Sequence, residues 1–80
     1  MKRLVSVSAP TVSVSDHFAA DGKAYAVLVN NDVRPHDGPV TVADGWRIVS
    51  VRTDRPDLVK LESGRLHMAP DTGVLVELAR

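Results

Sequence analysis

The chain has 80 residues, no cysteine, and ten basic residues balanced by ten acidic ones. This length allows one domain, and the absence of cysteine excludes a disulfide framework and a thiolate metal site. A neutral charge balance argues against a nucleic-acid or anionic-membrane surface, and no apolar run reaches the ~18 residues of a membrane span. We therefore expect a single domain over residues 1–80 that is cytoplasmic and has neither a nucleic-acid nor a membrane partner.

The first segment, residues 3–7, predicts a short strand. It follows a basic pair, but Ser6 and Ser8 interrupt the apolar stretch that a signal peptide would need. Pro10 should end the strand, because proline donates no hydrogen bond to a sheet.

Residues 11–18 predict a half-buried strand, because apolar and polar residues alternate along them. The inward side would carry Val12, Val14 and Phe18, with Asp16 as a polar exception, and the outward side Ser13, Ser15 and His17. Asp16 and His17 should point to opposite faces and not form an acid–base pair. The Asp21-Gly22 turn then predicts a hairpin into the next strand.

Residues 23–31 are apolar on both parities, with Ala24, Ala26 and Leu28 on one and Tyr25, Val27 and Val29 on the other. That pattern predicts a central strand that is covered on both faces. Residues 30–39 are then expected to form the longest loop, and loops on a rigid scaffold often carry function.

The second half of the chain predicts further short strands separated by turns. Asp44-Gly45 indicates a hairpin between residues 40–42 and 46–51, and Ser63-Gly64 indicates a tight turn between residues 58–61 and 66–69. Residues 74–78 would close the fold. We predict an all-β, small antiparallel β-sandwich of seven or eight strands.

No constellation of residues predicts catalysis, a metal site or a cofactor. The three histidines, His17, His36 and His67, lack the close pairing of zinc ligands, and no serine lies in a Gly-x-Ser-x-Gly turn. The three aromatic residues lie in or beside apolar strands, so we expect them in the core. The residues expected to contact a ligand or partner are Asn31, Asp32, Arg34, His36 and Trp46.

Three segments, taken in order, resemble the C-terminal β-sandwich that follows the catalytic barrel in many glycoside hydrolases. They are residues 20–31, 40–46 and 64–78. The resemblance is to family-42 β-galactosidases and, less closely, to domain C of α-amylase relatives. It implies a non-catalytic accessory domain that packs against a catalytic barrel or another protein partner. One face should then be unusually apolar, with the candidates Leu4, Val33, Val49, Val51 and Leu75.

Three alternatives remain open at this stage. A carbohydrate-binding module predicts that Trp46 or Tyr25 is exposed beside the loop of residues 30–39. A self-assembling homo-oligomer predicts pairing through a free edge strand, either residues 3–7 or the last strand. A small enzyme would use His36 and nearby aspartates.

Overall fold

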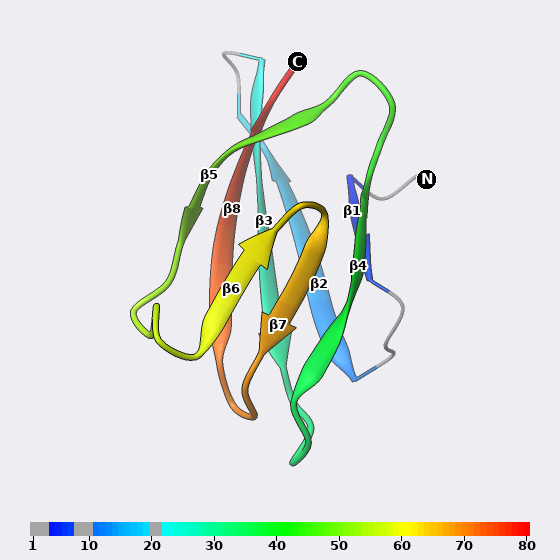
Figure 1. The fold of residues 1–80 in the computed structure, drawn as a ribbon. Helices are drawn as coiled ribbons and strands as arrows, with labels where there is room; N and C mark the ends of the chain where they lie inside the picture. Colours follow the sequence, from blue (N-terminus) through cyan, green and yellow to red (C-terminus); the bar gives the residue numbers. More distant parts are fainter. Residues whose placement is uncertain (1–3, 8–10, 20–21) are drawn as a thin grey trace.

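The computed structural model describes residues 4–7, 11–19 and 22–80, and these residues form two facing antiparallel sheets of four strands each. The predicted all-β sandwich is confirmed (Figure 1). The strands are β1 (Val5–Val7), β2 (Val12–Phe18), β3 (Lys23–Asn30), β4 (His36–Val42), β5 (Arg47–Arg52), β6 (Val59–Glu62), β7 (Arg65–Met68) and β8 (Gly73–Ala79).

One sheet has the order β1-β4-β7-β6 and the other the order β2-β3-β8-β5. In the first sheet β4 changes partner along its length: residues 36–39 pair with β7, and residues 40–42 pair with β1. Pro39 lies at this change of partner, where its missing N–H interrupts neither ladder. The last strand, β8, lies between β3 and β5, so the prediction that it offers a free edge is wrong.

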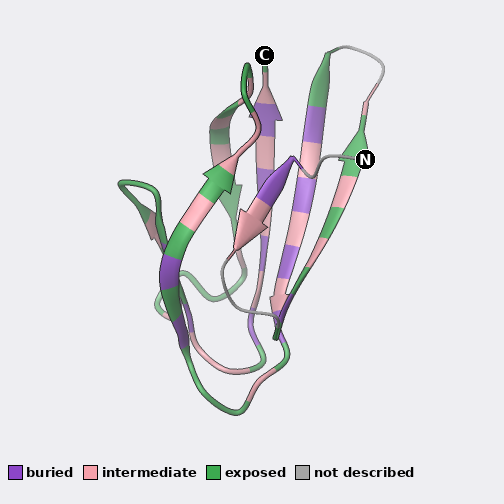
Figure 2. Ribbon diagram, turned by 90° about the vertical axis from the view of Figure 1, so that its right-hand side faces the viewer, coloured by how far each residue is buried: buried purple, intermediate pink, exposed green. Residues whose placement is uncertain are grey.

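The expected central strand is confirmed in position but only partly in its burial. β3 lies between β2 and β8, and the β2–β3 hairpin forms as predicted. Ala24, Ala26 and Leu28 point between the sheets and are buried, whereas Val27 and Val29 are half-buried. Figure 2 shows this alternation of buried and intermediate residues along the long strands. One face of β3 is covered by the other sheet, and its second face is an outer face of the described fold.

The core is aliphatic and lies between the two sheets. No aromatic residue is among its fully buried side chains. Both sheets contribute to it, and its buried apolar members are Leu4, Val5, Val12, Ala24, Ala26, Leu28, Val59, Leu66, Met68, Val74, Val76 and Leu78. The alternation predicted for the last strand is confirmed, because Val74, Val76 and Leu78 point into this core.

The hairpin predicted at Asp44-Gly45 is wrong, because β4 and β5 belong to different sheets. The backbone N–H of Trp46 donates to the carbonyl of Ala43 at 3.1 Å, and Gly45 has a φ of 86°. A positive φ at the third turn position is the mark of a type II turn, which does not match the twist of a paired hairpin. The turn instead carries the chain from one sheet to the other.

The long loop predicted at residues 30–39 is shorter than expected, because β4 already begins at His36. Three parts of the predictions lie outside the described residues. They are residue 3 of the first strand, the end of that strand at Pro10, and residues 20–21 of the turn between β2 and β3. Residues 5–7 of that first strand are seen as β1, paired with β4, and Leu4 precedes the strand.

The Ser63-Gly64 turn between β6 and β7 offers a test of the backbone conformation. Ser63 has a φ of 51° and Gly64 a φ of 76°, the left-handed pair of a type I′ hairpin. Asparagine tolerates this region better than serine, so Ser63→Asn should raise the free energy of unfolding by about 0.5–1 kcal/mol. Urea unfolding measures the change. Ser63→Ala is the control, because alanine has no side chain to stabilise a positive φ, and a gain of equal size there would contradict the argument.

Candidate functional site

The five residues predicted to contact a ligand or partner do not form one site. Asn31, Asp32 and Arg34 share the loop that follows the last residue of β3. Trp46 lies at the other end of the sandwich, in contact with Phe18, which pairs with Ala24 near the start of β3. The length of β3 therefore separates the two groups by roughly 20 Å.

The loop after β3 is held by short-range hydrogen bonds. The Asp32 carboxylate accepts from the backbone N–H of Val33 at 2.7 Å and of Arg34 at 3.3 Å. Its second oxygen lies 3.4 Å from the Arg34 guanidinium. Asn31 donates its side-chain amide to the Ser13 hydroxyl at 2.6 Å. These contacts explain Asp32 as a turn-forming residue, and they use the polar groups that the sequence had suggested for a ligand.

His36 is buried in a strand, whereas the sequence placed it in the loop of residues 30–39. It is the first residue of β4 and pairs with Met68 of β7. Its neighbour Asp37 is exposed and faces Arg65 at 3.3 Å. Adjacent strand residues point to opposite faces, so His36 and Asp37 do not combine into an acid–base pair. His17, for its part, lies 3.0 Å from the Ser15 hydroxyl on the outward side of β2, as its parity predicted.

The opposite end of the sandwich carries a cluster of rings and charge. The Phe18 and Trp46 ring centroids are 6.1 Å apart with an interplanar angle of 70°, an edge-to-face contact. The Arg80 guanidinium carbon lies 4.7 Å from the centroid of the Trp46 ring, within cation–π range. Phe18 is 64% exposed, which contradicts its predicted place in the core. The physical reason is local: Phe18 is on the inward parity, but it is the last residue of β2.

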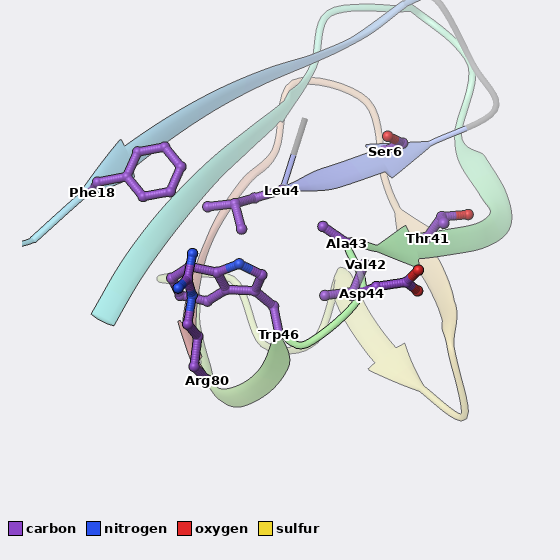
Figure 3. Close-up of a pocket in the computed structure, with 9 residues that line it drawn as sticks. All are labelled: Leu4, Ser6, Phe18, Thr41, Val42, Ala43, Asp44, Trp46 and Arg80. Carbon is purple, nitrogen blue, oxygen red and sulfur yellow. The ribbon is translucent and has the colours of Figure 1, made fainter. Parts of the chain in front are cut away.

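This ring cluster borders a pocket of about 580 Å³, which we call the aromatic pocket. In Figure 3 the rings and the guanidinium gather on one side, and the oxygen atoms of Ser6, Thr41 and Asp44 lie on the other. Its nine lining residues are Leu4, Ser6, Phe18, Thr41, Val42, Ala43, Asp44, Trp46 and Arg80. The sequence prediction included only Trp46. No local signal could have joined residues so far apart in sequence, because sheet pairing and the turn at residues 43–46 bring them together.

The two outer faces of the sandwich differ in chemistry. The outer face of the β1-β4-β7-β6 sheet carries exposed charged residues. Glu62 of β6, for example, lies across from Arg65 of β7, which has the opposite charge. The other outer face has four half-buried apolar side chains at its centre, which we call the apolar face: Tyr25, Val27, Val29 and Leu75. Polar residues surround it: Ser13, Ser15, His17, Arg47, Arg52 and Glu77.

The apolar face contains only one of the five residues that the sequence proposed for such a surface, namely Leu75. Leu4 is 3% exposed and belongs to the core, so its assignment is wrong. Val33 is 88% exposed but lies in the loop before β4. Val49 and Val51 lie on the edge strand β5. The sequence missed Val27 and Val29, because it predicted that both faces of β3 are covered.

No protein-family model, curated protein or solved structure matches this chain. Within the described ranges there is no helix long and apolar enough to cross a membrane. Over the same residues, no three histidine, cysteine, aspartate or glutamate side chains are grouped so that they could hold a metal ion.

Proposed function

We propose that this chain is a non-catalytic accessory domain that docks onto a neighbouring folded domain through the apolar face. The supporting observation is the contrast between the two outer faces of the sandwich. One carries exposed charged residues, among them Asp37, Glu62 and Arg65, and the other has an apolar centre with a polar border. An apolar centre within a polar rim is the usual anatomy of a protein–protein interface.

The size of the face favours a neighbouring domain over a stable homodimer. Four strands ~4.8 Å apart and about seven residues long enclose roughly 440 Å² of flat surface. A stable complex between free proteins buries about 800 Å² of accessible surface on each partner, which is more than a flat face of this size provides. Interfaces between linked domains are smaller, at about 600–1,500 Å² counted over both surfaces. Tethering supplies the high effective concentration that a small interface needs.

The resemblance to the C-terminal sandwich of glycoside hydrolases suggests a catalytic barrel as the neighbouring domain. Whichever fold the neighbour has, it should present a flat apolar surface with both charge signs at its border. Both signs are needed because Arg47 and Arg52 border one side of the apolar face and Glu77 lies beside Tyr25.

Site-specific photo-crosslinking tests the proposal. A benzophenone amino acid is placed at position 27 in the intact protein in its native cells, and cross-linked peptides are identified by mass spectrometry. We expect one dominant product that joins residue 27 to a peptide of a different folded domain. The matched control is position 60, where Lys60 lies on the charged outer face. Products that join two copies of this chain, or equal yields from positions 27 and 60, would overturn the proposal.

A substitution in the apolar face should weaken docking without unfolding the domain. Leu75 is half-buried on the outer face, so Leu75→Lys keeps its aliphatic stem on the sheet and its ammonium in water. We expect this variant to retain the wild-type circular dichroism spectrum and to lose the cross-link from position 27. The control Lys60→Ala should lose neither. An unchanged cross-link in Leu75→Lys would contradict the assignment of the face.

A further inference from the structure

The aromatic pocket combines features of a ligand site that the proposed docking function does not use. It lies at the end of the sandwich where β2 finishes and the chain crosses from β4 to β5. Its volume of about 580 Å³ falls within the usual range for small-molecule sites. Phe18 is 64% exposed at its border, although aromatic side chains in small domains normally bury most of their surface.

We infer that the aromatic pocket binds a neutral carbohydrate, with a pyranose ring resting on Phe18. A pyranose has a face of C–H groups and an edge of hydroxyl groups. The exposed phenyl ring matches the C–H face. The Asp44 carboxylate, which lines the pocket on the side away from the rings, matches the hydroxyl edge (Figure 3).

The charges around the pocket favour a neutral, hydroxyl-rich ligand over a charged one. Asp44 contributes one anionic group and Arg80 one cationic group, so an ionic ligand would meet a like charge on one side. A carboxylate accepts hydrogen bonds from hydroxyl groups and a guanidinium donates them. A polyhydroxylated ring can use both, because each hydroxyl both donates and accepts.

Trp46 acts as the support of this surface. It is half-buried, its ring meets Phe18 edge to face, and the Arg80 guanidinium stacks on it at 4.7 Å. These two contacts restrict the indole, and its edge-to-face contact restricts one side of the Phe18 ring. A ring held in place before binding loses less side-chain entropy when the ligand arrives.

The fluorescence of Trp46 provides the test, because it is the only tryptophan of the chain. The intact protein is titrated with maltose, cellobiose and lactose, and with a decaproline peptide as a probe of another chemical class. We expect a saturable change in emission, with a millimolar Kd, for at least one disaccharide. No change with any of the three sugars, or a saturable change with decaproline alone, would overturn the inference.

A pair of matched variants locates the binding. Phe18→Ala should raise the Kd for the disaccharide about tenfold, because stacking on one aromatic ring contributes about that factor in affinity. The side chain is exposed, so its removal should leave the fold intact. Val33→Ala is the control, since Val33 is 88% exposed and lies in the loop at the other end of β3. Equal Kd values for Phe18→Ala and Val33→Ala would show that the sugar does not bind on Phe18. Leu75→Lys should bind the sugar normally, so this result is independent of the docking proposal.

Discussion

Replacing Asn30 with alanine is expected to lower the free energy of unfolding by about 3 kcal/mol. Asn30 is the last residue of β3 and is completely buried. Its side-chain amide nitrogen lies within hydrogen-bonding distance of the carbonyl oxygens of Arg34, Met68 and Ala69, at 3.1, 3.2 and 3.3 Å. Its side-chain oxygen accepts from the backbone N–H of Asp32 at 3.1 Å.

One side chain thus ties the loop after β3 to the end of β7. Truncation to alanine would remove the side-chain donor to the buried Met68 carbonyl and the acceptor for the Asp32 N–H, and an unsatisfied buried polar group costs about 1–3 kcal/mol. A domain of this size has a stability of roughly 4–12 kcal/mol, so the loss would be a large share of it. Asn30→Asp should cost more, because a carboxylate would face the same carbonyl oxygens without a proton to donate.

Chemical denaturation followed by circular dichroism measures both changes. The neighbouring Asn31 is the matched control, because it is the same residue type but exposed, with one hydrogen bond to Ser13. Asn31→Ala should change the stability by no more than about 0.5 kcal/mol. If Asn30→Ala and Asn31→Ala had the same stability, the role given to the buried amide would be wrong.

The second large effect is expected at the centre of the core. Leu28 is 1% exposed and lies in β3, one of the two inner strands of its sheet. Its side chain points between the two sheets. Leu28→Ala should lower the free energy of unfolding by about 2–5 kcal/mol, through lost apolar burial and the cavity left behind. The surrounding valine and leucine residues lie on strands whose backbones are fixed by sheet hydrogen bonds. Their side chains can therefore close that cavity only in part.

Val27 is the adjacent control, because it belongs to the same strand but points to the outer face. Val27→Ala should cost no more than about 1 kcal/mol, from reduced strand propensity and partial burial. Thermal and urea unfolding of both variants would give the two values. Equal losses would mean that both faces of β3 are covered in the isolated chain, as the sequence pattern had suggested, and the apolar face would then not be free for docking.

The candidate site could be predicted from the sequence only in fragments. Trp46 was expected to contact a ligand or partner, but it was grouped with a loop at the other end of the sandwich. Phe18 was placed in the core because it has the inward parity of β2. The alternation along a strand predicts which face a side chain points to. It does not predict whether the opposite sheet extends far enough to bury that side chain. Arg80 carried no local signal, since its contact with Trp46 joins positions 34 residues apart in the chain.

The sequence by itself determined the strand content, the positions of most turns and the inward parity of the strands. These properties are local, because period-two alternation and left-handed turn residues act over a few neighbouring positions. The Ser63-Gly64 hairpin and the buried row of Val74, Val76 and Leu78 are examples.

Only the tertiary structure decided which strands pair and which faces stay uncovered. The Asp44-Gly45 turn has the composition of a hairpin, yet β5 pairs with β8 and β4 with β1 and β7. Strand pairing depends on contacts between segments distant in sequence, and a two-residue turn motif does not specify them. In the same way, an apolar strand such as β3 shows the same pattern whether its second face meets another layer or forms an outer face. The apolar face and the aromatic pocket both follow from that choice of pairing.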